Sequence, residues 1–418
     1  MFYVIVIYII IKGLMPFHFE EAMKKLGFVI PWYGDKIPGG AEAELRGIAK
    51  HLSAAGVDLE ILTTCVKEFG SDWNNDFHKP GLTEEGGLKV RRFKVRKRDT
   101  ALFDSVNYKF ITGAPVTPEE EQDFMREMVN STDLYDYLEQ HQDDYSLYVY
   151  IPYMFGTTYY GVLRVPEKAV VIPCLHEEAY AHMELFKEMF SKVRGAIYLA
   201  QSEHDLANRL YPMSQVKQAV LGAGVDSDFE GDASRFREKT GITDPFILYA
   251  GRKDEGKNIY LLIDYFREFR LRNKGSNLKL VLIGGGEVRI PEDIKSEVID
   301  LGFVERELKY DACAASLCLC QPSVHESFSI VIMESWLCRR PVLVHGGCDV
   351  TRSFAIGSNS GLYFDDYYEF EGALKFYINN PDKCEIMGKT GREFVLNNFT
   401  WDIIVKRYTD FFESLTEE

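Results

Sequence analysis

The chain has 418 residues, of which 46% are hydrophobic and 27% are charged, so it is long enough for two or three globular domains and its composition excludes intrinsic disorder. The 64 acidic residues outnumber the 48 basic ones, and the net charge of -16 opposes binding of DNA or RNA across the whole surface. The eight cysteines lie mostly in apolar runs without the paired spacing of a zinc site, which predicts reduced, buried thiols in a cytoplasmic protein.

The first segment of the chain is strongly apolar. It runs from Phe2 to Ile11 and is shorter than the stretch of about 20 residues that spans a bilayer. It also lacks the basic start and the small-residue cleavage site of a signal peptide. Because a first strand is expected just after Met23, we interpret residues 1–22 as an upstream extension, with a weak membrane-surface anchor as the alternative.

From Leu26 the chain alternates short apolar runs with amphipathic stretches, the pattern of a parallel sheet covered by helices. A first strand over 26–32 is followed by a glycine loop and by a helix from Ala41 that ends at Gly56. A capped helix is predicted over 117–129. Further strands of this half are predicted over 57–64, 89–95, 145–152, 169–175 and 195–202.

A second series of the same kind begins near Pro245, after a polar, glycine-containing stretch over 219–242 that is typical of a domain linker. Its strands are predicted over 246–251, 278–286, 298–303, 316–323 and 340–346. We therefore expect an N-terminal domain over 23–225, a C-terminal domain over 226–396, and a final helix over 397–418 that packs back on the first domain. The fold class is α/β, with a ligand cleft at the carboxyl edges of two parallel sheets.

The most informative motif is QPSVHESFSIVIMES, in which Glu326 and Glu334 are separated by seven residues. A strand ends at Cys320 before the motif, and a helix is expected to open near Ser329. The free N–H groups and the dipole of such a helix terminus suit a diphosphate, and the two carboxylates suit the hydroxyl groups of a sugar and a ribose. The alternative is an ordinary amphipathic helix with one exposed glutamate.

Two loops in front of helices carry further candidates. Arg252 and Lys257 follow a predicted strand in the stretch YAGRKDEGKN, and two cations there would neutralise a diphosphate without a metal. Gly39 and Gly40 precede the first helix and would let the backbone approach a phosphate closely. A solvated charged loop and a simple turn are the respective alternatives.

With these three motifs in this order, the chain resembles the retaining glycosyltransferases of the GT-B fold that carry an E-x7-E motif, the glycosyl transferases group 1. The resemblance runs from about Met23 to the end and is more specific in the C-terminal half. There it also covers LGAGVD at 221–226, LVLIGGGE at 280–287, LGFV at 301–304 and RPVLVHGG at 340–347.

The resemblance implies two Rossmann-like, doubly wound domains that face a central cleft, and it implies roles for the motif residues. Glu326 would contact hydroxyl groups of the donor sugar, and Glu334 would hold the ribose. Arg252 and Lys257 would clamp the diphosphate. The Gly40 amide, next to Gly39, would approach that diphosphate from the other domain.

The remaining implied contacts are made through the backbone and one histidine. Phe303 and Val304 would contact the base, and the amides of Ser327, Phe328, Ser329 and Ile330 would face the sugar. His176, in PCLHEEAY, matches a histidine beside the reacting sugar and would orient that sugar; a purely structural histidine is the alternative. The family usually has glycine where this chain has Ser329, so the identity of the donor sugar stays open.

Three other features have competing explanations. Asp226 and Asp228 spell a metal-binding DSD motif, but they lie in the linker, and Arg252 and Lys257 already supply positive charge, so we expect no metal site. The basic run over 89–98 is interpreted as a solvated edge strand, with attraction to anionic lipid as the alternative. The aromatic residues could stack on an acceptor sugar or belong to the core; they are Trp32, Tyr33, Tyr153, Phe155, Tyr159 and Tyr160.

The predicted function is retaining transfer of a hexosyl group from GDP-mannose or a UDP-sugar to a hydroxyl of a glycan or lipid-linked acceptor, as in cell-surface polysaccharide synthesis. No metal, cofactor or nucleic acid is expected to take part. The expected location is cytoplasmic, with peripheral contact with an anionic membrane at its inner face as the alternative. The alternative functions are a GT-B epimerase or phosphorylase, or a non-catalytic nucleotide-sugar-binding protein.

Overall fold

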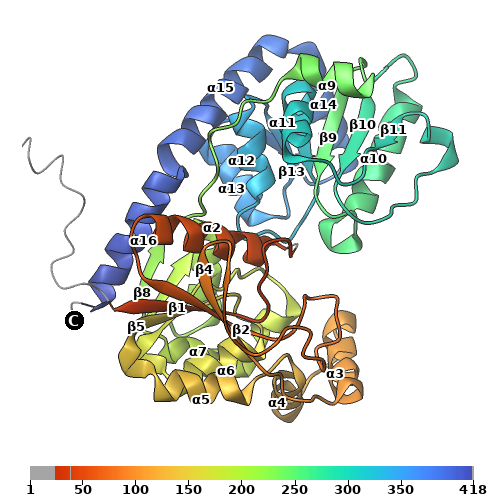
Figure 1. Ribbon diagram of the computed structural model, residues 1–418. Helices are drawn as coiled ribbons and strands as arrows, with labels where there is room; N and C mark the ends of the chain where they lie inside the picture. The colour runs from red at the N-terminus through yellow and green to blue at the C-terminus, as the bar shows by residue number, and fades with distance from the viewer. Residues whose placement is uncertain (1–23, 38, 417–418) are drawn as a thin grey trace, which may run out of the picture.

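The computed structural model describes residues 24–37 and 39–416, which form two lobes, each built around its own sheet (Figure 1). Both lobes have the predicted α/β class. The expected extension over residues 1–22, and its alternative as a surface anchor, lie outside the described residues. Within residues 24–37 and 39–416, no helix is long and apolar enough to cross a membrane.

The described part of the N-terminal lobe holds an eight-stranded sheet. Its strands in spatial order are β3 (Gly81–Glu85), β4 (Leu88–Phe93), β2 (Leu59–Thr64), β1 (Lys25–Ile30), β5 (Tyr145–Tyr150), β6 (Ala169–Val171), β7 (Gly195–Tyr198) and β8 (Lys217–Val220). All neighbours are parallel except β3, which runs antiparallel to β4. The central strand β1 is buried from Leu26 to Ile30 because helices cover both faces of the sheet.

Helices of the N-terminal lobe divide between the two faces of this sheet. They are α2 (Gly40–Ala54), α3 (Thr100–Thr112), α4 (Pro118–Glu127), α5 (Thr132–Gln140), α6 (Gly156–Arg164), α7 (Glu184–Lys192) and α8 (Gln201–Leu210). Helix α2 packs Leu45, Ile48 and Leu52 on one face, and α5 and α6 cover the other. The predicted cap on α4 is confirmed, because Thr117 and Glu120 form a reciprocal capping box.

The described part of the C-terminal lobe holds a six-stranded, fully parallel sheet. Its spatial order is β11 (Val298–Asp300), β10 (Lys279–Ile283), β9 (Phe246–Ala250), β12 (Cys318–Gln321), β13 (Val342–His345) and β14 (Gly361–Phe364). The helices from the linker to the C-terminus are α9 (Ala233–Thr240), α10 (Ile259–Arg272), α11 (Arg306–Ala315), α12 (Ile330–Leu337), α13 (Asp349–Gly357), α14 (Tyr367–Asn379), α15 (Pro381–Asn398) and α16 (Trp401–Thr416). All eight cysteines are buried and unpaired, as the sequence predicts.

The chain crosses between the lobes twice, and the two crossings lie side by side. The Val225 N–H donates to the Phe399 carbonyl at 2.8 Å, and a parallel bridge joins Val225 to Thr400. Helix α16 then lies along α2 of the N-terminal lobe (Figure 1). Near the end of α16, the Ser414 carbonyl accepts a hydrogen bond from Lys217 Nζ of β8 at 2.6 Å. A single hydrophobic cluster continues from Phe28 in the N-terminal lobe to Trp336 in the C-terminal lobe. The two lobes therefore share apolar packing at the crossing.

The basic run over 89–98 is not a solvated edge strand, so that interpretation was wrong. Strand β3 pairs with β4 and takes the edge position, because its turn at Gly86 and Gly87 folds it back on β4. Arg92 is buried and donates to the Tyr33 carbonyl at 2.9 Å. Arg91 Nε lies 2.6 Å from Glu60 Oε1, and Lys25 Nζ lies 3.1 Å from Oε2 of the same carboxylate. Much of the run is thus engaged in ion pairs and hydrogen bonds within the lobe.

Candidate active site

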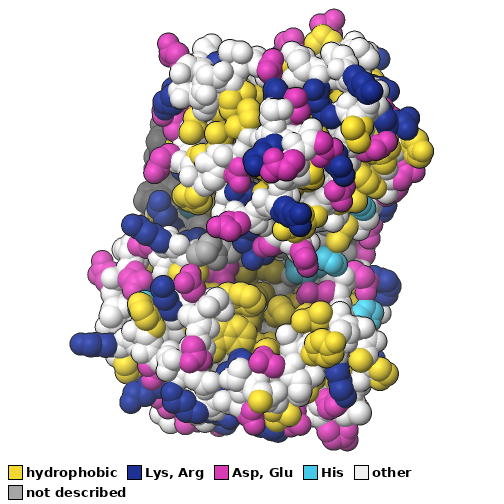
Figure 2. Space-filling model, turned by 90° about the vertical axis from the view of Figure 1, so that its right-hand side faces the viewer, with side chains coloured by type: hydrophobic (Ala, Val, Ile, Leu, Met, Phe, Trp, Pro, Cys, Tyr) yellow, Lys and Arg dark blue, Asp and Glu magenta, His cyan; other side chains and the backbone are white. Residues whose placement is uncertain are grey.

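Two pockets open along the junction of the lobes, where Figure 2 shows the surface hollowed and lined with hydrophobic side chains on the side of the N-terminal lobe. The first, of about 470 Å³, is lined by Glu334 and Ile330 of α12 and by residues of α2; we call it the Glu334 pocket. The second, of about 510 Å³, is lined by His176 and Glu326 and by residues of α8 and α13; we call it the His176 pocket. Both pockets draw residues from both lobes.

The loop before α12 brings Glu326 to the N-terminus of that helix. Ser329 is the residue before the helix and takes a left-handed conformation, with φ of 67°. This conformation favours glycine and costs about 1 kcal/mol or more for a residue with a Cβ atom. Buried Gln321 lies beneath the loop, and its Nε2 donates to Glu326 Oε1 at 3.2 Å. The carboxylate is therefore held above the free amide end of α12.

Lys257 and Glu326 form an ion pair that joins two loops of the C-terminal lobe, with Nζ and Oε1 2.7 Å apart. Lys257 ends a short 3-10 turn, η4 (Glu255–Lys257), which is fixed because Asp254 Oδ1 accepts from the Lys257 N–H at 3.0 Å. Arg252 lies in the same loop and is mostly exposed; its Nε is 3.4 Å from Asp254 Oδ2. The structure thus brings Lys257 and Glu326 into contact and leaves the Arg252 guanidinium largely in solvent.

His176 faces this pair from the N-terminal lobe and lines the same pocket as Glu326. Its Nδ1 lies 3.3 Å from Glu178 Oε1, which also accepts from the Tyr153 hydroxyl at 2.9 Å. Burial favours the neutral imidazole of His176. The hydrogen bond and the charge of Glu178 outweigh burial and raise the pKa of His176, and other carboxylates that include Glu326 add smaller effects in the same direction. The ring is therefore oriented by Glu178 and inclined to carry a proton.

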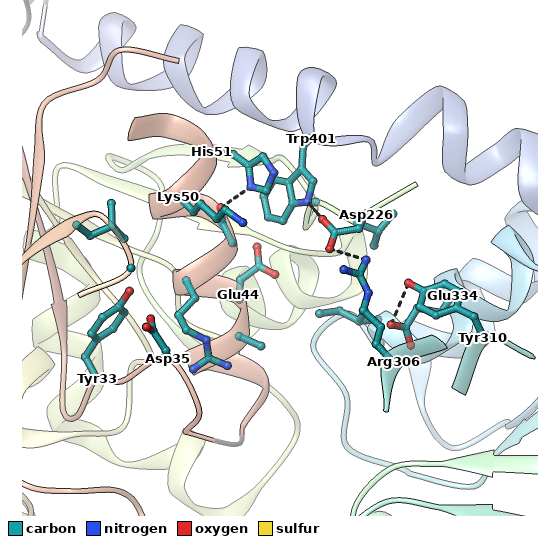
Figure 3. A pocket seen from close by; sticks show the side chains of 18 residues that line it. Tyr33, Asp35, Glu44, Lys50, His51, Asp226, Arg306, Tyr310, Glu334 and Trp401 are labelled. Atoms are coloured by element: carbon teal, nitrogen blue, oxygen red, sulfur yellow. Dashed lines mark hydrogen bonds and ion pairs between the residues drawn. The ribbon is translucent and has the colours of Figure 1, made fainter. Parts of the chain in front are cut away.

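Glu334 lies on α12, in the other pocket, and has two partners on α11. Its Oε1 accepts from Lys309 Nζ at 2.6 Å and from the Tyr310 hydroxyl at 3.3 Å. Figure 3 shows Glu334 and Arg306 on one wall of the pocket, with the side chains of α2 opposite. A buried carboxylate with two donors keeps free lone pairs, which can accept from vicinal hydroxyl groups of a ligand.

The glycine pair stands at the start of α2. Gly39 precedes the helix with φ of 144°, a conformation that side chains rarely adopt, and a Cβ atom there would lie 1.8 Å from Glu42 Oε2. A Cβ atom on Gly40 would meet nothing within 4 Å, so the space beside that residue is open. Glu42 is fixed by the Trp32 indole, whose Nε1 donates to Oε1 at 2.6 Å. The amide end of α2 is thus accessible.

The other residues predicted to bind donor lie in different environments. Phe328 is buried against Phe354, whereas Ser327 and Ile330 are half-buried. Phe303 is 87% exposed, and Val304 is half-buried. All of the donor-site roles of these residues stay predictions.

Several residues that contact the predicted site were missed from the sequence. Glu178 follows His176 by two positions in an acidic stretch, a spacing that could have been noticed. Gln321, Lys309 and Tyr310 carry no local signal, because their contacts with Glu326 and Glu334 depend on how strands and helices pack.

Asp226 of the DSD motif and most of the aromatic residues contact other side chains of the protein. Asp226 Oδ1 accepts from Trp401 Nε1 at 2.7 Å, and its Oδ2 lies 2.7 Å from the Arg306 guanidinium. Within residues 24–37 and 39–416 there is no group of three or more histidine, cysteine or acidic side chains arranged to hold a metal ion. Most of the aromatic side chains belong to the core; these are Trp32, Tyr33, Tyr153, Phe155 and Tyr159.

Comparison with known proteins gives matches to both halves of the chain. Residues 232–394 match the family model described as glycosyl transferases group 1. An uncharacterized glycosyltransferase of Methanocaldococcus jannaschii is 28% identical, over 94% of this chain and 99% of its own length.

A shorter segment, 27% of this chain and 30% of the relative, is 34% identical to the N-acetylgalactosamine-N,N'-diacetylbacillosaminyl-diphospho-undecaprenol 4-alpha-N-acetylgalactosaminyltransferase of Campylobacter jejuni. Among solved structures, sucrose-phosphate synthase from Thermosynechococcus elongatus superposes with a TM-score of 0.69 and 16% identity, over 94% of this chain and 99% of its own. This superposition confirms the two-domain architecture that the sequence predicts.

Proposed function

We propose that the chain, whose residues 232–394 match the glycosyl transferases group 1 and whose two domains have the GT-B fold, transfers a hexosyl group from a nucleoside diphosphate sugar to a hydroxyl group. The donor we propose is GDP-mannose or a UDP-sugar, and the acceptor a glycan or a lipid-linked glycan. Transfer proceeds with retention at the anomeric carbon.

The observation that carries this proposal is the contact between Lys257 and Glu326 above the amide end of α12, with His176 facing it from the other lobe. A cation and free N–H groups bind the diphosphate, and a carboxylate beside them accepts from sugar hydroxyl groups. When donor binds, Lys257 shares its charge between the phosphate and Glu326. His176 orients the sugar, and its proton-bearing form adds positive charge near the leaving group.

In the proposed reaction the bond between the anomeric carbon and the phosphate oxygen breaks, and a bond from that carbon to the acceptor oxygen forms on the same face. The departing phosphate takes the proton of the acceptor hydroxyl. Stabilisation of the negative charge that develops on this phosphate is the main contribution of Lys257, Arg252 and the amides. These groups supply positive charge from the protein, so we propose that the reaction needs no metal ion.

A lipid-linked acceptor is supported by the surface of the N-terminal lobe and by one relative. The name of the Campylobacter jejuni relative specifies a diphospho-undecaprenol acceptor. The N-terminal lobe of the present chain exposes Phe69, Phe77, Tyr108 and Ile111, and the Lys67 ammonium lies 5.4 Å from the Phe77 ring. Apolar side chains next to basic ones favour peripheral contact with an anionic bilayer.

The test is a panel of UDP-sugars and GDP-sugars with the purified full chain. The proposal predicts that at least one donor raises the melting temperature and that nucleotide release from this donor increases when a polyprenyl-diphosphate glycan is added. The same assay with a chelator checks the metal-free reaction, which should proceed unchanged. Product with inverted configuration, or the absence of binding across the panel, would contradict the proposed reaction.

A further inference from the structure

Glu44 is a buried acid on the wall of the Glu334 pocket that the reaction above does not use. It lies on α2, one helical turn after Gly40, and is 3% exposed. Figure 3 shows its side chain inside the pocket, across from Asp226 and Glu334. Within residues 24–37 and 39–416, no hydrogen-bond partner reaches its buried Oε1.

An unpartnered carboxyl group at such a position is costly. Burying an ionised carboxylate without a hydrogen bond or a counter-ion is strongly unfavourable, and a buried polar atom without a partner is rare in folded proteins. A ligand that fills the pocket could supply the missing partner.

The neighbouring acid decides which form Glu44 takes. Glu203 on α8 is also buried, but its two oxygens accept from the backbone N–H groups of Leu175 at 2.7 Å and Leu199 at 2.6 Å. Burial raises the pKa of Glu203 to about 7, but these donors favour its ionised form and keep its pKa below that of Glu44, which has no such donor. Burial, with a smaller effect of the Glu203 charge, raises the pKa of Glu44 to about 8. The proton therefore resides on Glu44 at neutral pH.

Other titratable groups around Glu44 do not compete for this proton. Burial raises the pKa of the Cys174 thiol and of the Tyr408 phenol well above their usual values, so both remain neutral. The other charged and titratable side chains that share the pocket are Tyr33, Asp35, Arg46, Lys50, His51, Asp226, Arg306, Tyr310 and Glu334. Of these, Asp226 is paired with Arg306, and Glu334 with Lys309.

We propose that Glu44 is a protonated positioning residue that donates a hydrogen bond to a phosphate oxygen of a nucleoside diphosphate that reaches from Glu334 to the Lys257–Glu326 contact. The inference rests on the proposed function for the identity of the ligand. Phosphate is the partner because Gly40 and Glu44 are four residues apart on one face of α2, and the open amide end at Gly40 is where the diphosphate is proposed to lie. A neutral carboxyl group can donate to an anion, whereas a carboxylate would repel it.

The proposal has a pH signature. Because the phosphate favours the protonated form, affinity is greatest below the pKa of free Glu44 and falls as the pH rises above it. Binding at alkaline pH must then take up a proton from solvent. For a free pKa near 8, the dissociation constant should rise about tenfold between about pH 7 and about pH 9.

The experiment is isothermal titration of the full chain with UDP, GDP, ADP and dTDP at neutral and alkaline pH, in buffers of different ionisation enthalpy. Wild-type protein should show proton uptake at alkaline pH. Glu44→Gln keeps a neutral hydrogen-bond donor of the same shape, so this variant should still bind the nucleotide at neutral pH. It should lose most of the proton uptake, and its affinity for the nucleotide should change less than about twofold across the pH range. Glu84→Gln, an exposed site on β3, is the matched control and should behave as wild type.

A second variant separates a role in binding from a role in folding. Glu44→Leu removes an unpartnered buried polar group, so its melting temperature should equal or exceed that of wild type. Its affinity for the nucleoside diphosphate should fall about tenfold at neutral pH, because one hydrogen bond to phosphate is lost. Equal proton uptake by wild type and Glu44→Gln, or unchanged affinity of Glu44→Leu, would overturn the role of Glu44. If no nucleotide binds to wild-type protein, the proposed function itself fails.

Discussion

Trp401 fixes the place where the chain returns from the C-terminal lobe, and its removal gives a testable loss of stability. The indole stacks on His51 of α2 with ring centroids 4.0 Å apart and an angle of 6° between the planes. Its Nε1 donates to Asp226 of the linker at 2.7 Å. Cβ atoms added to Gly47 and Gly224 would lie 2.4 and 2.2 Å from the ring, so the backbone of α2 and of the linker packs directly against it.

Two substitutions separate these contributions. Trp401→Phe keeps an aromatic ring for the stack but loses the hydrogen bond to a carboxylate, which should cost about 1.5 kcal/mol in the free energy of unfolding. Trp401→Ala also loses the ring from a site that two glycines leave open for it, so the total cost should reach about 3 to 4 kcal/mol. Urea unfolding followed by circular dichroism measures both values. If Trp401→Ala unfolds within about 1 kcal/mol of wild type, the crossing does not depend on this side chain.

Three further predictions concern single side chains. Gly224→Ala should lose about 1 to 3 kcal/mol in unfolding free energy because the added Cβ atom meets the indole, and this cost should largely disappear in the Trp401→Ala background. Burial opposes ionisation of Glu60, but its two cationic partners outweigh burial and lower its pKa. Its ion pairs therefore stabilise the fold above the unfolded-state pKa, and this stabilisation is lost as the pH falls through the folded-state pKa. Glu60→Gln should therefore lose about 2 kcal/mol at neutral pH and converge with wild type in acid unfolding curves; a constant difference would contradict the pairing. Glu178→Gln should lower the pKa of His176, as followed by NMR titration of the imidazole protons, whereas an unchanged titration would show that Glu178 does not orient the ring.

The sequence predicted the parts of the fold in which local pattern and burial agree. Strands such as β1 and β9 are covered on both faces, so they read as continuous apolar runs that are easy to recognise. Strands β3, β8 and β14 were not predicted, because almost none of their side chains is fully buried and they lack a continuous apolar run. A glycine at the start or end of a turn does not by itself indicate that an edge strand is present.

The residues of the candidate site also differ in whether a local sequence pattern could identify them. Glu326 and Lys257 could be selected because each follows a strand in a loop before a helix, and Glu334 because seven residues separate it from Glu326. Their partners could not, since the contact between Lys257 and Glu326 joins residues 69 positions apart. Arg92 and Glu44 show the reverse problem: both are charged residues that the sequence would place at the surface, and both are buried by elements distant in the chain. Such burial depends on tertiary packing that periodicity does not encode.

Turnover of the Lys257→Ala variant tests the proposed donor site at Lys257 and Glu326 most directly. Nucleotide release would be measured with the donor that stabilises wild-type protein, beside Lys274→Ala as a control in which an exposed lysine of the same lobe is removed. We predict that Lys257→Ala keeps the circular dichroism spectrum of wild type and loses about 100- to 1,000-fold in turnover, while Lys274→Ala stays active. Near-normal turnover by a folded Lys257→Ala variant would contradict the proposed donor site.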